Sequence, residues 1–142
     1  MLFKLPLAYL AGVRVHSIEK DAAIVSIRHR WLNQNPFKSV FWAAQGMAAE
    51  IATAVLVMKG IESCGKKVSM LVINQRGSFT KKATGTIQFE CLDGTLVSKA
   101  MEASMKTGTP STIEMNARGL NEEGKLVSSF CFEWSLKVKN VC

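Results

Sequence analysis

Glu50 is the residue of this chain whose surroundings best suit chemistry. It is the only ionisable residue between Lys38 and Lys59, in a stretch composed mainly of alanine, methionine and branched aliphatic residues. An acid among apolar neighbours has a raised pKa unless hydrogen bonds or a cation compensate it, and such groups are frequent at functional sites. A carboxylate of this kind can take a proton from water or attack a carbonyl carbon. The structural alternative is a glutamate held by a salt bridge or by backbone donors at a subunit interface.

Small residues surround Glu50 on one face of a predicted helix. At about 100° per residue, the stripe that contains it also holds Ala43, Gly46, Thr53 and Val57. These small side chains leave room for a ligand to approach the backbone closely. The opposite face carries apolar groups suited to packing on a sheet, namely Phe41, Ala48, Ile51, Ala52 and Val55.

The cysteines and histidines do not form a metal or nucleophile motif. The four cysteines are far apart without a CxxC pair, and two histidines, His16 and His29, are too few for a zinc site of the usual spacing. Both histidines are expected at the surface or at a sheet edge. No GxSxG, P-loop or GxGxxG pattern occurs. We therefore expect no metal and no cofactor, and free thiols are typical of a cytoplasmic protein.

The chain carries a formal net charge of +7, but its basic residues are scattered. They do not form a dense stripe with interleaved aromatics, so nucleic acid is not the expected partner. A diffuse positive field equally suits a small phosphorylated molecule, and an ordinary solvated surface is the simplest interpretation of any single lysine. The best candidates for phosphate contacts are Arg76, Lys81 and Lys82.

The length of 142 residues and the periodicity predict one domain of mixed helices and strands, over residues 1–142. We expect a short N-terminal helix, two strands within 12–30 joined by a turn at 19–21, and a helix over 40–59 closed by Gly60. Strands are predicted over 67–80 and 85–92, and a short helix over 93–107. Alternating apolar residues then predict two strands, around 112–118 and 129–138, with their hairpin loop at 121–124.

The helix over 40–59 is apolar on nearly every side, so it must be buried in protein or in a membrane. Gln45 and Glu50 near its middle argue against a membrane, because a central acid is costly in lipid. The half-apolar strands also need a helix to cover them. The predicted fold is therefore α+β, with a curved antiparallel sheet wrapped around a long central helix and no membrane partner.

This layout resembles the hotdog fold of the thioesterase superfamily, especially the phenylacetate-type acyl-CoA thioesterases and their uncharacterised relatives. The resemblance covers nearly the whole chain and is carried mainly by RWLNQNPFKSVFWAAQGMAAEIATA. It implies a homodimer with one continuous sheet, in which further pairing to a tetramer is left open. It also implies a thioester site at the dimer interface. There an acid on the helix of one protomer faces a backbone amide at the helix N-terminus of the other.

Under this resemblance Glu50 matches the helix acid, and Asn35 or Asn33 matches the loop asparagine upstream. Where the family typically has His-Gly-Gly, this chain has approximately Phe41-Trp42-Ala43, and Gly46 lies deeper in the helix. Two functions follow as alternatives. One is an acyl-CoA thioesterase that uses Glu50, with the coenzyme A thioester as its substrate. The other is a non-catalytic hotdog module that binds an acyl chain or acyl-CoA, or serves as a dimeric scaffold, with the two aromatic residues plugging the former opening.

Overall fold

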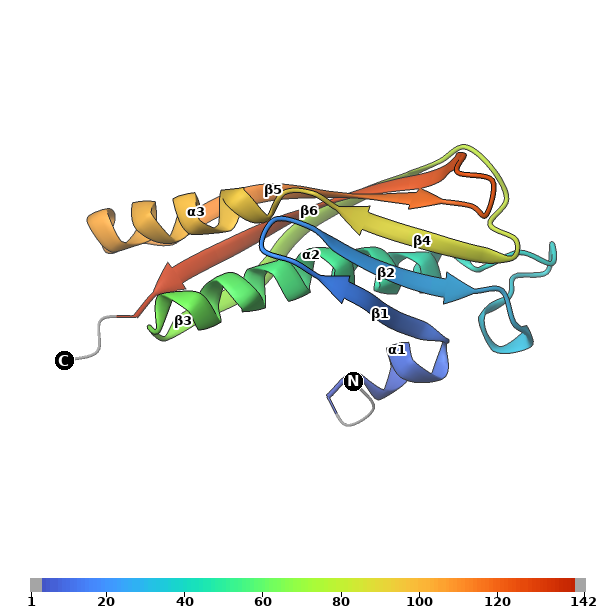
Figure 1. The fold of residues 1–142 in the computed structure, drawn as a ribbon, viewed down its shortest axis with the longest axis horizontal. Helices are drawn as coiled ribbons and strands as arrows, with labels where there is room; N and C mark the ends of the chain where they lie inside the picture. Colours follow the sequence, from blue (N-terminus) through green and yellow to red (C-terminus); the bar gives the residue numbers. More distant parts are fainter. Residues whose placement is uncertain (1–3, 140–142) are drawn as a thin grey trace.

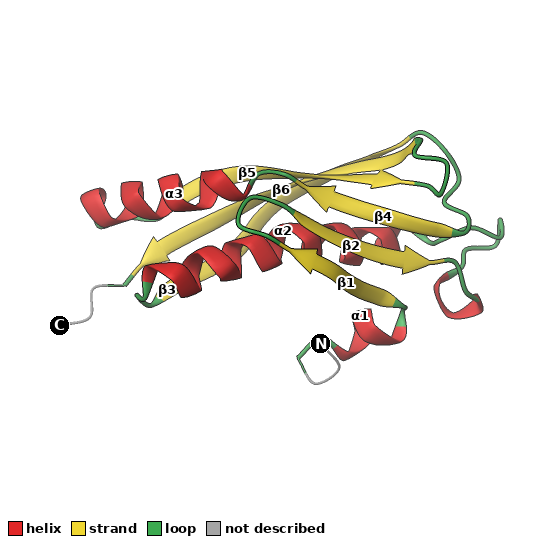
Figure 2. Cartoon of the chain, viewed as in Figure 1, coloured by secondary structure: helices red, strands yellow, loops and turns green. Residues whose placement is uncertain are grey.

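A computed structural model describes residues 4–139 of the chain (Figures 1 and 2). Each expected helix and strand is present in the expected order. The helices are α1 (Pro6–Leu10), α2 (Trp42–Cys64) and α3 (Gly94–Thr107), with a 3₁₀ turn, η1, at Trp31–Asn33. The strands are β1 (Val13–Ile18), β2 (Ala23–Arg28), β3 (Val68–Phe79), β4 (Thr86–Cys91), β5 (Ser111–Leu120) and β6 (Leu126–Val138).

The strands form one six-stranded sheet in the order β1-β2-β4-β5-β6-β3, and its neighbouring strands pair antiparallel. The long helix α2 lies along one face of this sheet, and α3 packs against α2, β5 and β6 (Figure 1). This arrangement confirms the predicted α+β fold with a central helix. Its shape follows from the strands, which are apolar on one face and must bury that face against a helix.

The core lies between α2 and the inner face of the sheet. Alanines on the helix, among them Ala48, Ala49 and Ala52, let the backbone of α2 come close to the strands. Larger side chains from the strands fill the space, including Phe89, Met115, Phe130, Trp134 and Leu136. Two buried polar groups are satisfied by this packing: the Trp134 indole N–H donates to Thr53 Oγ1 at 2.9 Å, and Thr53 Oγ1 donates to the Glu50 carbonyl at 2.8 Å.

Helix α2 does not end at Lys59 as predicted, but continues to Cys64. Gly65, with φ of 69°, takes the left-handed conformation that closes the helix. Gly60 has a different role, because a Cβ atom there would lie 2.6 Å from Cγ1 of Val97. The missing side chain of Gly60 lets α3 pack directly on α2, which no pattern within the helix itself could indicate.

The prediction that α2 is buried on every side is also wrong. Trp42 and Met58 are each 53% exposed, and the Glu50 side chain reaches the solvent. The sheet covers one side of the helix only, so an apolar side of α2 stays uncovered in the single chain. Among residues 4–139, no helix is long and apolar enough to cross a membrane.

Strand β3 is an edge strand that pairs with β6 on one side. Its register shifts between Val72 and Asn74, so Ile73 is an extra residue that forms a β-bulge. Leu71 and Ile73 are 64% and 49% exposed, and the other edge of β3 pairs with no strand of the described chain. A long, apolar edge strand of this kind is a template for pairing with another chain.

Candidate functional site

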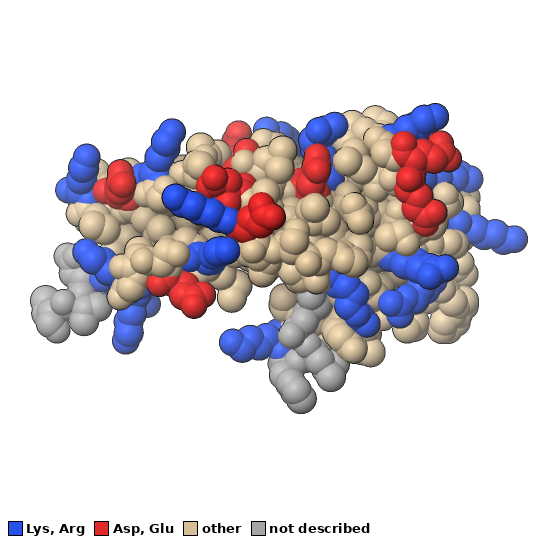
Figure 3. Space-filling model, in the orientation of Figure 1, with Lys and Arg blue, Asp and Glu red and all other residues tan. Residues whose placement is uncertain are grey.

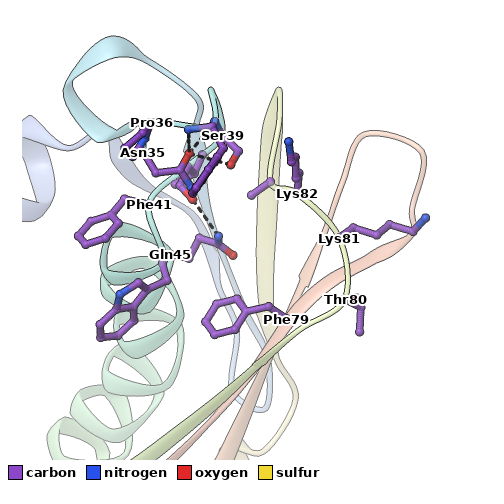
Figure 4. A pocket seen from close by; sticks show the side chains of 13 residues that line it. Asn35, Pro36, Ser39, Phe41, Gln45, Phe79, Thr80, Lys81 and Lys82 are labelled. Atoms are coloured by element: carbon purple, nitrogen blue, oxygen red, sulfur yellow. Dashed lines mark hydrogen bonds between the residues drawn. The ribbon is translucent and has the colours of Figure 1, made fainter.

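A cavity of about 550 Å³ opens at the N-terminus of α2, between the loop that precedes the helix and the segment that follows β3 (Figure 4). The structure thereby brings together five residues predicted for the site, Asn35, Phe41, Trp42, Lys81 and Lys82. The other lining residues are Pro36, Phe37, Ser39, Val40, Gln45, Phe79, Thr80 and Ala83.

Asn35 shapes the loop on one side of the cavity. Its side-chain Oδ1 accepts hydrogen bonds from the Phe37 amide at 2.9 Å, the Ser39 amide at 3.2 Å and the Ser39 hydroxyl at 3.1 Å. Its own amide donates to the Ser39 carbonyl at 2.8 Å. Within residues 4–139 the side-chain Nδ2 of Asn35 donates no hydrogen bond, and Asn35 lines the cavity.

Gln45 is a cavity residue that the sequence analysis did not assign to the site. Its side chain is 4% exposed, with Nε2 donating to the Val40 carbonyl at 3.1 Å and Oε1 accepting from the Ser128 hydroxyl at 2.8 Å. These bonds join the start of α2 to the preceding loop and to β6. A polar side chain in the first turn of an otherwise apolar helix is the sequence feature that could have indicated Gln45.

The first turn of α2 presents free backbone donors. Phe41 is the N-cap residue and makes no side-chain capping bond. The first intrahelical bond runs from the Gln45 amide to the Phe41 carbonyl at 3.1 Å. The amides of Trp42, Ala43 and Ala44 therefore have no acceptor within the helix, and the helix dipole adds partial positive charge there.

Aromatic side chains form the apolar wall of the cavity. Phe41 and Trp42 pack edge to face with ring centroids 6.0 Å apart, and they are 46% and 53% exposed. Phe79 packs edge to face on Phe130 at 5.5 Å and lines the side opposite α2 (Figure 4). Phe41 and Trp42 thus line an open cavity, which argues against the expectation that they plug it.

Two lysines lie at the rim on the segment after β3. The Lys82 side chain extends along the rim, whereas that of Lys81 extends away from α2 in this view (Figure 4). Both side chains are exposed. They add positive charge beside the free amides of α2, which favours an anionic group at the mouth of the cavity.

Glu50 does not line the cavity within the single chain. It lies eight residues after Trp42, about 12 Å along the helix axis at the usual rise. Burial by its neighbours removes part of its hydration and raises the pKa of its carboxyl above the ordinary value of 4.5. The acid is therefore more basic than a free glutamate, although it is not enclosed as the sequence suggested.

Five further predicted residues lie outside the cavity lining, namely Asn33, Ala43, Gly46, Thr53 and Arg76. Ala43 follows Trp42 in the first turn of α2. Asn33 is buried, with Nδ2 donating to the carbonyls of Ala11 and Arg28 at 2.8 and 2.7 Å, so its side chain is used in holding the loop. Gly46 lies against the Phe130 ring, and the Thr53 hydroxyl is engaged by Trp134. Arg76 forms an ion pair with Glu114 at 3.3 Å and lies beside Cys131 in the register, on the face of the sheet opposite to Phe130.

Within residues 4–139, no three side chains of the metal-ligand types gather closely enough to hold a metal ion. Cys64, Cys91 and Cys131 are free thiols. His16 is exposed on β1, with Nε2 2.6 Å from the Ser26 hydroxyl. His29 is half-buried, and its Nε2 has no hydrogen-bond partner among the residues that the structure describes.

Residues 1–136 match the profile of a protein family described as "Domain of unknown function (DUF4442)". The chain belongs to this family. No curated protein is similar enough in sequence to count as a match. The assignment therefore names a family without naming an activity.

Solved structures show what fold this family member has. A Pseudomonas aeruginosa protein described as a probable thioesterase is 17% identical with a TM-score of 0.85, covering 97% of this chain and 91% of that chain. A Chlorobaculum tepidum protein of unknown function is 18% identical with a TM-score of 0.84, covering 97% and 89%. A mutant of a Staphylococcus aureus thioesterase enzyme is 13% identical with a TM-score of 0.72, covering 93% and 98%. The fold is the hotdog fold of these structural relatives.

Proposed function

We propose that this protein is an acyl-CoA thioesterase of the hotdog superfamily, with Glu50 as its catalytic acid–base or nucleophilic group. The observation that carries this proposal is the cavity at the uncapped N-terminus of α2, with aromatic walls and two lysines at its rim. An acyl group fits the aromatic wall, a carbonyl oxygen fits the free amides, and the phosphates of coenzyme A fit the lysines.

The chemistry divides between the amides and the acid. In hydrolysis by general base catalysis, Glu50 takes a proton from water as the water oxygen attacks the carbonyl carbon. The resulting oxyanion is stabilised by the amides of the first turn of α2. Collapse of this intermediate breaks the carbon–sulfur bond, and the thiolate takes the proton back from Glu50. In the nucleophilic alternative the Glu50 carboxylate attacks the carbonyl carbon, and the carbon–sulfur bond breaks to release the thiolate and leave an acyl-Glu50 anhydride. Water then hydrolyses this anhydride to the free acid and the Glu50 carboxylate.

The separation of these groups favours a site shared between two copies of the chain. About 12 Å along α2 separates Trp42 from Glu50, too far for both to act on one carbonyl. A second copy can supply the missing group, because both the apolar side of α2 and the outer edge of β3 are open in the single chain. In this homodimer, Glu50 of one protomer serves the cavity of its partner.

The cavity wall also bears on the substrate. Phe37, Phe41, Trp42 and Phe79 form an aromatic wall that suits an aryl or other apolar acyl group. This is consistent with the resemblance to the phenylacetate-type branch. Asn35 Nδ2 and the lysines are the groups available for the polar part of the thioester.

The alternative is a non-catalytic hotdog module that binds an acyl chain or acyl-CoA. Its support is the sequence Phe41-Trp42-Ala43 in place of the His-Gly-Gly typical of the resembled thioesterases. Bulky side chains at this point narrow the approach of a thioester to the amides. A binding module would keep the cavity but hydrolyse nothing.

Hydrolysis of a panel of acyl-CoAs, from short to long and including arylacetyl-CoA, separates these functions. Glu50→Gln is compared with wild type and with Glu62→Gln, which removes an exposed acid on the same helix. We expect Glu50→Gln to lower kcat by about 10²–10⁴-fold and Glu62→Gln to leave it unchanged. Thiol release is corrected for the cysteines of the protein itself.

Two results would contradict the thioesterase proposal. One is wild-type protein that hydrolyses no member of the panel above background. Binding of a non-hydrolysable acyl-CoA analogue by that inactive protein would establish the module. The other is full activity in Glu50→Gln, which would place the chemistry on another group.

A further inference from the structure

A second apolar surface lies on α1 and η1, outside the lining of the cavity. Four of its side chains are among the most exposed large apolar groups of the described chain: Leu7 (70%), Leu10 (58%), Trp31 (79%) and Leu32 (64%). We refer to these four residues as the α1/η1 face. Large apolar side chains gathered on a surface in this way mark an interaction site.

The α1/η1 face is held together by hydrogen bonds and packing. Asn33, the last residue of η1, donates from Nδ2 to the carbonyl of Ala11 at 2.8 Å, directly after α1. The Arg30 guanidinium packs on Gly12, where a Cβ atom would lie 3.0 Å from its terminal nitrogen. The two elements therefore form one fixed surface, and in Figure 1 both project on the side of the molecule beyond β1 and β2.

The charges around this face have one sign. No acidic residue occurs in 4–18 or in 22–49, whereas these segments contain Lys4, Arg14, Arg28, Arg30 and Lys38. The two acids of the first 49 residues, Glu19 and Asp21, lie in the β1–β2 turn, at the far end of the hairpin from α1 and η1. Figure 3 shows basic side chains without acidic ones along this lower edge, from the grey N-terminal residues towards the right.

Other groups near this end of the sheet do not neutralise it. Arg14 stacks on Tyr9, with its guanidinium carbon 3.9 Å from the ring centroid, and makes no ion pair with an acid of residues 4–139. Of the acids in the β5–β6 loop, Glu123 pairs with Lys125 at 3.7 Å, and Glu122 accepts from the amide of Thr86, the strand partner of Arg28, at 2.9 Å. One acid thus faces several cations at this end. The rim of the α1/η1 face is therefore basic.

Pairing of two chains through β3 does not by itself cover α1. The sheet order places β1 and β3 at opposite edges, and α1 packs on β1. A second copy whose β3 pairs with this β3 therefore adds at the edge of the sheet farthest from α1, and this strand pairing leaves Leu7 and Leu10 exposed.

We propose that the α1/η1 face docks this protein on the surface of a bilayer that contains anionic lipid. Exposed leucines and a tryptophan enter the boundary between headgroups and acyl chains, while the surrounding lysines and arginines bind lipid phosphates. Charge complementarity favours an anionic bilayer as the binding partner, because the basic rim matches the anionic headgroups and the apolar centre matches the acyl chains of the lipid. The proposal departs from the expectation of no membrane partner, which was argued from the cost of an acid in a membrane-spanning helix.

Docking would place the cavity next to lipid. Phe37, which is 70% exposed, belongs to the same loop as Trp31 and also lines the cavity. The cavity therefore lies beside the α1/η1 face. Docking itself does not depend on Glu50 or on the proposed hydrolysis, so either can be wrong without the other.

Co-sedimentation with vesicles tests the proposal. Wild-type protein is mixed with phosphatidylcholine vesicles and with vesicles in which about a third of the lipid is phosphatidylserine. We expect binding to the anionic vesicles that weakens as salt is added, and little binding to the neutral ones. The double variant Leu10→Ser with Trp31→Ser should lower the partition coefficient about tenfold or more.

Matched variants distinguish binding through this face from non-specific hydrophobic and electrostatic binding. Leu92→Ser with Met105→Ser removes exposed apolar groups from the α3 region, and should bind vesicles as wild type does. Lys4→Glu with Arg28→Glu should weaken binding, whereas Lys66→Glu with Lys99→Glu, an equal charge change elsewhere, should weaken it less. Hydrolysis of a soluble short-chain acyl-CoA should be unchanged in the Leu10→Ser, Trp31→Ser variant.

Three results would overturn the proposal. Wild type that stays in the supernatant with anionic vesicles excludes bilayer docking. Equal loss of binding in the two apolar double variants, or in the two charge variants, shows that no particular face is used. The third result is a wild-type protein that binds no vesicles but forms an oligomer, while the Leu10→Ser, Trp31→Ser variant forms smaller species. It would show that the face mediates contacts between copies of the chain.

Discussion

The two halves of α2 belong to one continuous helix but have different environments. In the C-terminal half, Gly60 lets Val97 of α3 pack on the helix, Leu56 and Val57 are fully buried, and Gly65 closes the last turn. In the N-terminal half, the first turn has no side-chain cap, Trp42 is exposed and Glu50 reaches solvent. Both halves bury one side against the sheet, the N-terminal half with a run of alanines that includes Ala48 and Ala52. The difference is that the polar groups without partners in the helix are concentrated in the N-terminal half.

The difference shows how one helix can serve as both scaffold and site. Free amides and a desolvated acid destabilise a protein slightly, and they persist only where the rest of the structure supplies enough stability. Burial against the sheet supplies it in both halves, and contact with α3 at Gly60 adds to it in the C-terminal half. Changes at the first turn of α2 and at Glu50 should therefore alter activity more than stability, and changes at the contact between α2 and α3 should do the reverse.

The largest expected effect comes from Ala43→Pro, in the first turn of α2. Proline removes one backbone N–H there without removing an intrahelical bond, because the first-turn amides have no acceptor in the helix. We expect kcat for the best acyl-CoA to fall by about 10²–10³-fold, the usual cost of one oxyanion donor. The free energy of unfolding, measured with urea, should change little.

Mixing this variant with Glu50→Gln tests whether the site is shared between copies. Each inactive homodimer lacks one group, but a mixed dimer retains one site with an intact acid and an intact amide. Unfolding and refolding the two together should restore about a quarter of wild-type activity. Failure to restore activity, with dimers re-formed, would mean that Glu50 and Ala43 act within the same protomer.

An effect of intermediate size is expected from the same substitution at two glycines of α2. At Gly60 a Cβ atom would lie 2.6 Å from Cγ1 of buried Val97, a stiff side chain, so Gly60→Ala should destabilise by roughly 1–2 kcal/mol. At Gly46 the nearest contact is 3.6 Å, so Gly46→Ala should stabilise by up to about 1 kcal/mol through helix propensity. Thermal or urea unfolding measures the change in the free energy of unfolding for both variants. A change of the same sign in the two variants would contradict the proposed difference between the halves.

The smallest expected effect is the pH dependence of stability from Glu50. Its pKa is raised in the folded chain by desolvation, so the unfolded chain ionises first as pH rises through 4.5. The ionisation of Glu50 therefore contributes nothing to the free energy of unfolding well below pH 4.5, and it lowers that free energy above the raised pKa. Glu50→Gln should be slightly more stable than wild type at neutral pH, and the two should converge in acid; Glu62→Gln serves as the control. A Glu50→Gln variant less stable at neutral pH would mean that the carboxylate has a stabilising partner.

Much of the fold follows from local patterns in the sequence. Alternation in β5 and β6 places Met115, Ala117 and Phe130 on the inner face, as predicted, because one face of each strand is buried. The start and end of α3 were also predicted, since Gly108 takes the left-handed conformation that ends it. Of the residues predicted for the site, Asn35, Lys81 and Lys82 lie at one cavity, whereas Arg76 does not, and their roles stay predictions.

Arg76 shows where local patterns fail. Counting in twos from Val68, Met70 and Val72 would place Arg76 on the inner face of β3, towards α2. The bulge at Ile73 reverses this alternation, so Arg76 lies on the outer face, opposite Cys131 and paired with Glu114. A bulge depends on the partner strand, and nothing in the order of residues along β3 marks it.

The sequence by itself determined the elements, their order and the presence of one acid in an apolar helix, because these depend on side-chain periodicity and local turn chemistry. Only the tertiary structure decided which side of each element is covered. It ended α2 at Gly65 rather than Gly60, left Glu50 in contact with solvent, and opened a cavity at Trp42. Each outcome depends on contacts between residues far apart in the chain, whose energies are absent from any single segment.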